Sequence, residues 1–176
     1  ETWDQHILMD VAVHVGTLLS VLLYFRSDVI KMFIGLYTAI TGQVNNPGTQ
    51  LVTKLIAGSI PVIVAGLILH ILEPSWILSV QIMAWATLIF GIVLWFADRI
   101  PVKHENLDTL SFRDSVIIGL LQCLALIPGT SRSGITMITA RFLGFNRADS
   151  AHFSMLLGIV AISGAGALSG ISMLKD

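Results

Sequence analysis

The chain has 176 residues, of which 55% are hydrophobic and only 12% are charged, whereas about 25% of the residues of an ordinary soluble domain are charged. Ten Lys and Arg residues nearly balance eleven Asp and Glu residues, so the net charge is −1. This balance excludes a strongly basic surface for nucleic acid, and a mean hydropathy of +0.83 excludes an ordinary water-soluble domain. The composition therefore indicates a membrane protein.

Four apolar stretches are long enough to cross about 30 Å of hydrocarbon, for which a helix needs about 20 residues. They cover residues 7–25, 51–72, 76–97 and 152–174. The first stretch contains Asp10 and His14, one helical turn apart, so we expect a span with a polar patch. The sequence thus predicts an all-α fold, a polytopic helical bundle that forms a single membrane domain over residues 1–176.

Residues 28–41 are too few to cross the membrane and are amphipathic. Ile30, Phe33, Ile34 and Tyr37 recur with the spacing of one helical face, and smaller or polar residues occupy the other. This pattern predicts a helix that lies in the membrane interface.

Residues 114–145 contain two short apolar stretches separated by a polar segment, Pro128–Ser133. Pro and Gly break a helix, so we expect two half-helices joined by a turn, a re-entrant hairpin whose turn is buried in protein or lines a wet cavity. Ser111 and Asp114 have the spacing of a capping box at the start of the first half-helix.

The basic residues test this topology. With a flat helix and a re-entrant hairpin, one side of the membrane collects Arg26, Lys31, Lys54, Arg99, Lys103, Arg113, Arg141 and Arg147. The turn at residues 73–75, which has no Lys or Arg, falls on the opposite side. The positive-inside rule then places both ends of the hairpin in the cytoplasm. We expect a multi-pass membrane protein.

The polar segment between the half-helices has the sequence Pro-Gly-Thr-Ser-Arg-Ser-Gly-Ile-Thr, residues 128–136. The N-terminus of the second half-helix presents unpaired N–H groups and a positive dipole end, which suit an anion. Ser131, Ser133 and Thr136 add hydroxyl groups, and Arg132 adds a planar fork that matches two phosphate oxygens. We expect a phosphate or pyrophosphate site, with Gly129 and Thr130 contributing at the turn.

A plainer interpretation is that the hydroxyl groups only cap the helix and that Arg132 pairs with a carboxylate. Against it, an Arg near the bilayer centre costs about 2.5 to 3.5 kcal/mol on insertion scales, which favours a functional role. Asp10 and His14 are weaker site candidates, because a hydrogen bond between helices would account for both.

The nine-residue segment resembles the Pro-Gly-x-Ser-Arg-Ser-x-x-Thr signature of the bacterial undecaprenyl-diphosphatase family, also called the bacitracin-resistance family. The similarity extends through residues 118–127 before it and, after it, to Gly144, Arg147, Ala151, Phe153-Ser154 and Leu156-Leu157. The resemblance implies a membrane phosphatase that removes the terminal phosphate of undecaprenyl diphosphate and so recycles the lipid carrier of peptidoglycan precursors. It also implies a location in the bacterial plasma membrane, a polyprenyl diphosphate substrate, a divalent cation (Mg or Ca) and an inverted repeat. It leaves a homodimer open.

Family members carry a second motif upstream, a Glu-x-x-x-Glu segment followed by Pro-x-Ser-Ser-Thr-Gly-His, which this chain lacks. We expect it to precede Glu1, and the last spans of the family to follow Asp176. The resemblance therefore places the catalytic His and the metal ligands outside this chain, with no metal site within it. Gln122 stands where the missing motif would carry its first Glu.

Two hypotheses follow. In the first, an enzyme, Arg132, Ser131 and Ser133 hold the phosphate while a group outside the chain attacks it. In the second, the chain is part of a transporter or flippase for an anionic lipid or solute, because broken helices and inverted repeats also build transporters. An upstream Glu-x-x-x-Glu and His motif would favour the enzyme.

Overall fold

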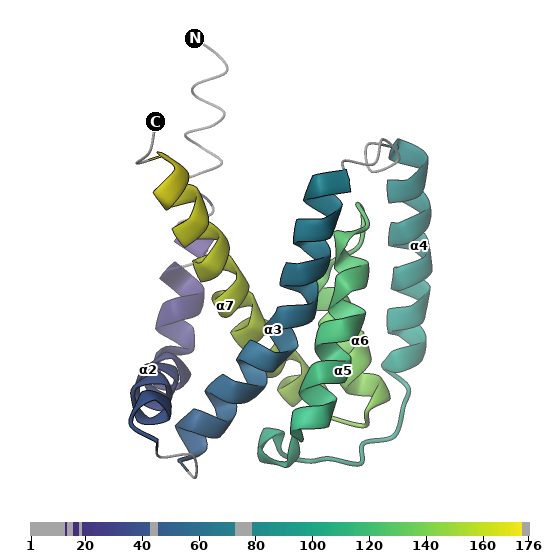
Figure 1. Cartoon of the computed structure of the whole chain (residues 1–176). Coiled ribbons are helices and arrows are strands. Elements are labelled where there is room, and N and C mark those ends of the chain that lie inside the picture. The colour runs from purple at the N-terminus through teal and green to yellow at the C-terminus, as the bar shows by residue number, and fades with distance from the viewer. Residues whose placement is uncertain (1–12, 14–15, 18, 43–45, 73–78, 174–176) are drawn as a thin grey trace. The chain divides into compact units, whose positions relative to one another are not determined.

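The computed structural model describes residues 13, 16–17, 19–42, 46–72 and 79–173, with side chains as far as residue 161. Every regular element in these ranges is a helix (Figure 1), which confirms the predicted all-α class. The chain divides into two compact units, Glu1–Val52 and Thr53–Asp176. We describe each unit by itself.

Within the described ranges, two helices are long and apolar enough to cross a membrane. They are α3, Pro47–Leu72, and α4, Val80–Ala97, with mean hydropathies of 2.4 and 2.0. Only 17% and 11% of their most apolar windows are buried, so both helices leave apolar side chains available to lipid. α3 begins at Pro47, before the predicted start at residue 51, and Pro suits the first turn because it needs no N–H partner there.

The other two predicted spans are described only in part. Residues 1–12, 14–15 and 18 lie outside the described part of the chain, and with them nearly half of the span predicted at 7–25, whereas residues 19–24 are helical. α7, Arg147–Met173, covers the span predicted at 152–174. It begins earlier because Asn146 caps its first turn, the Asn146 Oδ1 accepting from the Asp149 N–H at 2.8 Å.

In the first unit, α2, Arg26–Ile40, covers most of the predicted amphipathic helix at 28–41. It buries its small and polar side, where the hydroxyl groups of Thr38 and Thr49 lie 2.7 Å apart and Gly35 meets the backbone of Gly48. The apolar face stays open, with Phe33 and Tyr37 exposed by 70% and 69%. A free apolar stripe is what a helix in the membrane interface requires, and the interfacial position stays a prediction.

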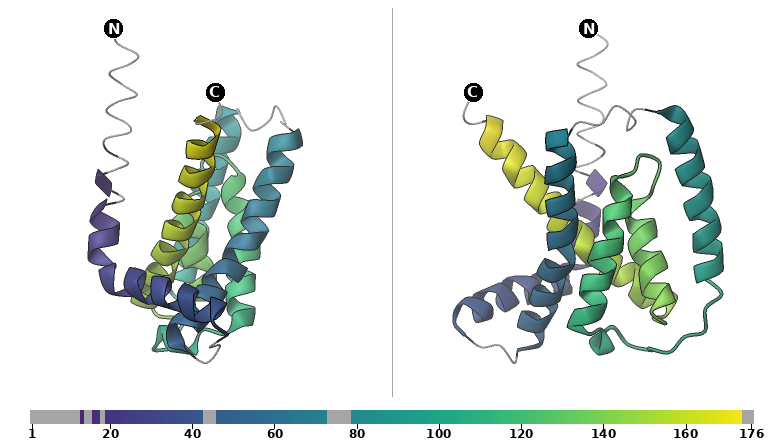
Figure 2. Two further views of the ribbon diagram at one scale, coloured as in Figure 1. Left: turned by 60° about the vertical axis from the view of Figure 1, so that its left-hand side comes forward. Right: turned by 45° about the vertical axis from the view of Figure 1, so that its right-hand side comes forward.

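In the second unit, α5, Phe112–Gln122, the 3₁₀ helix η3, Cys123–Leu126, and α6, Arg132–Phe142, form a helical hairpin. Figures 1 and 2 show its two arms side by side, with the turn at one end. The predicted capping box is confirmed: the Ser111 hydroxyl accepts from the Asp114 N–H at 3.1 Å, and the Asp114 carboxylate accepts from the Ser111 N–H at 3.0 Å.

The first arm of the hairpin crosses α3 at two glycines. A Cβ atom on Gly119 would lie 2.3 Å from the Gly58 carbonyl oxygen, far inside van der Waals contact. The buried Ser115 hydroxyl donates to the Lys54 carbonyl in the same crossing. Because the two backbones touch, the position of α5 against α3 depends on the absence of a side chain at residue 119.

The second arm, α6, packs against α4 and α7 (Figure 2). Ala97 of α4 and Ile135 and Ile138 of α6 form a buried cluster, to which Phe90 and Val93 add. On α7, Phe153, Leu156 and Leu157 are each no more than 1% exposed. α6 is thus the central helix of the second unit, and the polar turn lies at its start.

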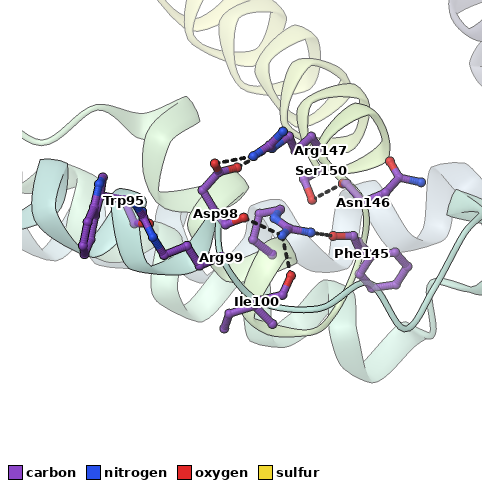
Figure 3. Close-up of polar contacts among 9 residues, drawn as sticks. Trp95, Asp98, Arg99, Ile100, Phe145, Asn146, Arg147 and Ser150 are labelled. Carbon is purple, nitrogen blue, oxygen red and sulfur yellow. Dashed lines mark hydrogen bonds and ion pairs between the residues drawn. The ribbon is translucent and has the colours of Figure 1, made fainter.

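A group of three charged residues, Asp98, Arg141 and Arg147, joins the opposite end of α6 to its neighbours; we call it the basal clasp. Arg141, only 5% exposed, donates to the Phe145, Asp98 and Ile100 carbonyls at 2.6, 3.0 and 2.6 Å. Arg147 donates through Nε and Nη2 to the Asp98 carboxylate, at 2.5 Å for each bond (Figure 3). The sequence placed both arginines among the basic residues on one side of the membrane and revealed no partner for either.

The two ends of the hairpin meet at this basal end. The Lys103 N–H donates to the Gly144 carbonyl at 2.7 Å, and the Asn146 side-chain amide donates to the Glu105 carbonyl at 3.0 Å. The segment before α5 and the segment after α6 therefore lie together, as a hairpin requires. Re-entry of this hairpin into a membrane stays a prediction.

The glycine crossing gives a direct test of the packing of α5 on α3. We expect Gly119→Ala to lower the stability of the purified protein by about 1 to 3 kcal/mol, because the added methyl group overpacks two touching backbones. Gly91→Ala on exposed α4, where a Cβ meets nothing within 4 Å, is the matched control and should be neutral or slightly stabilising. Thermal unfolding in detergent measures both, and equal unfolding temperatures would contradict the crossing.

The basal clasp predicts a pH dependence. The hydrogen bond from Arg147 lowers the pKa of Asp98 below its ordinary value, so the pair stabilises the fold above the unfolded pKa, about 3.9, and loses this contribution as pH falls through the lower folded pKa. We expect Asp98→Asn to remove this part of the acid sensitivity. Thermal unfolding between neutral pH and about pH 3 should show a smaller fall for the variant; parallel curves would argue against the clasp.

Candidate functional site

The polar turn is fixed by a close approach to α4. Gly129 has φ +86°, and a Cβ atom there would lie 2.3 Å from the Met83 carbonyl oxygen. The Thr87 hydroxyl lies 2.8 Å from the Met83 carbonyl and 2.9 Å from the Gly129 carbonyl, so one donor serves both. Only glycine fits this position, both by conformation and by space, and the turn is thereby held against the first turns of α4.

The turn leads directly into the N-terminus of α6. Ser131 is the N-cap residue, and its hydroxyl accepts from the Gly134 N–H at 3.2 Å and lies 3.3 Å from the Ser133 hydroxyl. Among the described residues, no acceptor pairs with the N–H groups of Arg132 and Ser133. Helix capping by Ser131 is thus confirmed, and it leaves two amides and the Ser133 hydroxyl available at the helix start.

Arg132 is half-buried and makes no hydrogen bond or ion pair with any residue that the structure describes. Its guanidinium lies against α7, where a Cβ atom on Gly158 would be 3.4 Å from the Arg132 Nη2. A carboxylate partner, the plainer interpretation of this residue, is therefore absent from the described part of the chain. The guanidinium fork retains its full capacity to bind an anion.

Thr136 and Thr130, also predicted to bind phosphate, have different surroundings. Thr136 is 2% exposed, and its hydroxyl lies 2.6 Å from the Ser154 hydroxyl of α7. The Thr130 hydroxyl and the side-chain amide of Gln122 are buried and have no hydrogen-bond partner within the described residues. The turn thus brings Ser131, Arg132 and Ser133 together, and places Thr136 behind them, one helical turn deeper.

The turn lies toward one end of α4 rather than at its middle. Gly129 contacts Met83, in the first turn of α4, whereas the basal clasp lies at Asp98, just beyond the last residue of the same helix. The hairpin therefore extends along most of α4. The contacts thus place the turn closer to the N-terminal end of α4 than to its middle; the depth of the turn in a membrane stays a prediction.

The polar turn does not suit a divalent cation by itself. Hard cations such as Mg²⁺ and Ca²⁺ take carboxylate and carbonyl oxygens, whereas the turn offers hydroxyl groups, amides and a guanidinium. Within the described ranges, no three His, Cys, Asp or Glu side chains come together. The cation stays a prediction from the resemblance. Asp10 and His14, the weaker candidates, lie outside the described residues.

Two residues of the site region were not predicted as site residues: Thr87 on α4, and Ser154 on α7, which the sequence marked only as part of the family similarity. Both are hydroxyl residues within apolar helices, and both contact the polar segment from the side. A polar residue in a membrane helix generally faces the protein interior. That rule, applied to each span, would have singled out both residues but not their partners.

These features define a class: an all-helical membrane protein in which a helical hairpin presents hydroxyl groups, free amides and an arginine at its turn. The family model described as bacitracin resistance protein BacA matches residues 1–176, and the chain belongs to this family. The resemblance drawn from the nine-residue signature is thereby confirmed.

Relatives named undecaprenyl-diphosphatase match nearly the whole chain. The protein from Ruegeria pomeroyi is 46% identical over 168 residues, which cover 95% of this chain and 63% of the relative. The protein from Teredinibacter turnerae is 45% identical over 170 residues, 97% of this chain and 64% of the relative. That from Saccharophagus degradans is 42% identical over 173 residues, 98% and 65% respectively. The chain thus spans less than two thirds of the length of each.

Proposed function

We propose that the protein containing this chain hydrolyses undecaprenyl diphosphate to undecaprenyl phosphate and so recycles the lipid carrier used in cell-wall synthesis. The observation that carries the proposal is the start of α6, where no described residue pairs with the half-buried Arg132 side chain or with the Arg132 and Ser133 amides. The printed names of the relatives support the same activity. In this family, such a phosphatase would also underlie bacitracin resistance.

The three residues at the turn would bind the diphosphate and stabilise the charge that develops on it. The Arg132 fork can pair with two phosphate oxygens, while the Ser133 hydroxyl and the free amides donate to the others. Phosphoryl transfer depends mainly on positioning and on such electrostatic stabilisation. The attacking group and any divalent cation would come from parts of the protein outside this chain.

The apolar surface of α3 and α4 would contact the membrane and the lipid tail of the substrate. We propose that α3 and α4 span the plasma membrane, that the hairpin re-enters it, and that the basal clasp lies on the cytoplasmic side with the basic loops. The turn, near the N-terminal end of α4, then lies closer to the opposite side. We also propose that the hairpin forms an inverted repeat with the upstream motif, and that the protein forms a homodimer.

The alternative, a transporter or flippase for an anionic lipid or solute, would use the same anion site. The relatives' names favour the enzyme. The two are separated by product: an enzyme releases inorganic phosphate from the lipid diphosphate in detergent, where no transport takes place.

Substitution of Arg132 tests the proposed site. Arg132→Lys keeps the charge but loses the planar guanidinium, which can pair with two phosphate oxygens. Loss of one charge-assisted contact costs about 1.5 to 3 kcal/mol, which lowers the rate roughly ten- to a hundredfold. The exposed Arg113→Lys is the matched control and should retain activity. Phosphate release from undecaprenyl diphosphate measures both. Full activity in Arg132→Lys and Arg132→Ala would rule out the proposed role.

The membrane topology has its own test. In a Cys123→Ala background, single cysteines at Thr109 and Asn146 should both be protected in intact cells from a thiol reagent that cannot cross the membrane, because a re-entrant hairpin returns both ends to the cytoplasm. A cysteine at Ser75, on the predicted outer side, should react and serves as the control. Labelling of Asn146→Cys but not Thr109→Cys would mean that the segment crosses the membrane.

A further inference from the structure

We propose that Ser154 of α7 is a positioning residue for the phosphate site: through Thr136 it fixes the first turn of α6, so that Arg132 and the free amides converge on one anion. The inference rests on the proposed phosphatase function. It assigns a role to a residue outside the nine-residue signature, on a helix that contributes no ligand to the phosphate.

The contact between α7 and the start of α6 is a buried cluster of hydroxyl groups. Ser154 and Thr136 are 4% and 2% exposed, and their hydroxyl oxygens are 2.6 Å apart. The Thr136 hydroxyl also lies 3.0 Å from the Ser133 carbonyl and 3.2 Å from the Arg132 carbonyl. The Ser154 hydroxyl lies 3.3 Å from the Ser133 carbonyl.

The count of hydroxyl protons determines what this cluster can do. Each hydroxyl has one proton to donate; one proton lies between the two oxygens, and the other goes to a carbonyl of Arg132 or Ser133. This holds whichever oxygen donates in the pair, so neither hydroxyl has a proton left for a phosphate. The cluster therefore acts on the backbone of the site residues, and in a buried, low-dielectric setting such linked hydrogen bonds strengthen one another.

A second contact, one helical turn further along α7, concerns the guanidinium itself. Gly158 follows Ser154 by four residues and so lies on the same helix face. A Cβ atom at Gly158 would be 3.4 Å from the Arg132 Nη2, so the guanidinium rests directly on this part of α7. One face of α7 thus supports the backbone of Arg132 through Ser154 and the head group of Arg132 at Gly158.

The plain alternative is that the Ser154–Thr136 bond only stabilises the bundle, as hydrogen bonds between membrane helices generally do. The two possibilities differ in how they depend on Arg132. A positioning role operates through Arg132, so removal of the Ser154 hydroxyl should have no further effect on catalysis once Arg132 is gone. A role in stability alone would reduce activity by the same factor with or without Arg132.

The experiment is a double-mutant cycle on the intact purified protein, with phosphate release from undecaprenyl diphosphate in detergent as the assay. Ser154→Ala should lower kcat/KM roughly tenfold, because displaced binding groups lose transition-state contacts. In an Arg132→Ala background the same change should have little effect. Ser154→Thr, which keeps a hydroxyl, should restore most of the activity, whereas Ser154→Cys, a poor hydrogen-bonding group, should resemble Ser154→Ala.

Ser150→Ala is the matched control. Ser150 lies on the same helix and is 1% exposed, but its hydroxyl donates only within its own helix, to the Asn146 carbonyl at 2.7 Å. This variant removes a buried α7 hydroxyl without touching α6 and should keep its activity. Unfolding temperatures identify any variant that is merely unstable, in which case the comparison of Ser154→Cys with Ser154→Thr decides.

Two results would overturn the inference while leaving the proposed function intact. They are a Ser154→Ala activity equal to that of Ser150→Ala, and an equal fractional loss with and without Arg132. A protein with no substitution that releases no phosphate from undecaprenyl diphosphate would overturn the proposed function itself, and the inference with it.

Discussion

The structure of the second unit depends on one constraint: a turn between two helices leaves backbone polar groups without helical partners, and each must find another partner. Thr87 donates to the Gly129 carbonyl, Ser131 accepts from the Gly134 N–H, and the Thr130 N–H donates to the Ile127 carbonyl. No acceptor in the described part of the chain pairs with the N–H groups of Arg132 and Ser133. An anion is the natural partner for two such amides beside a guanidinium, so the same constraint that shapes the turn also makes it a candidate anion site.

The geometry of this site is set by contacts that allow almost no backbone movement. Gly119 touches Gly58 on α3, and Gly129 touches Met83 on α4, each without room for a Cβ atom. At the basal end, Arg141 binds carbonyls that follow α4 and α6. The hairpin is thus held at its tip, at its first arm and at its base. In a frame of this kind the binding groups are already aligned, so substrate binding does not have to order them.

Sequence patterns predicted the parts of this arrangement that depend on local chemistry. The break at residues 128–133, the capping box at Ser111 and the cap at Ser131 all follow from the conformational preferences of single residues, and the structure has them. The contacts between helices were not predictable. Nothing in an apolar span of α4 or α7 reveals that Thr87 and Ser154 lie beside the turn, because side-chain periodicity identifies a face but not the partner of that face.

The place of the turn along α4 shows the same limit. The sequence shows that each arm of the hairpin is short, but not where along a neighbouring helix the turn between them lies. The contact of Gly129 with Met83, close to the start of α4, shows that the hairpin extends along most of that helix. Helix lengths bound this place only loosely, since the packing of α5 on α3 and of α6 on α4 decides where along a neighbour the hairpin stops.

Arg132 and Arg141 show how the surroundings of a residue decide its role. Both belong to α6 and both carry a charge into a largely apolar unit, so from composition alone either is a candidate for function. The two Nη groups of Arg141 are taken up by three carbonyls, which identifies it as part of the frame. Arg132 has no such acceptor among the described residues and sits beside two unpaired amides. Since a guanidinium that has lost part of its hydration needs acceptors, and the described residues supply them to Arg141 but not to Arg132, the acceptors of Arg132 must come from a ligand, from water or from a part of the protein beyond the described residues.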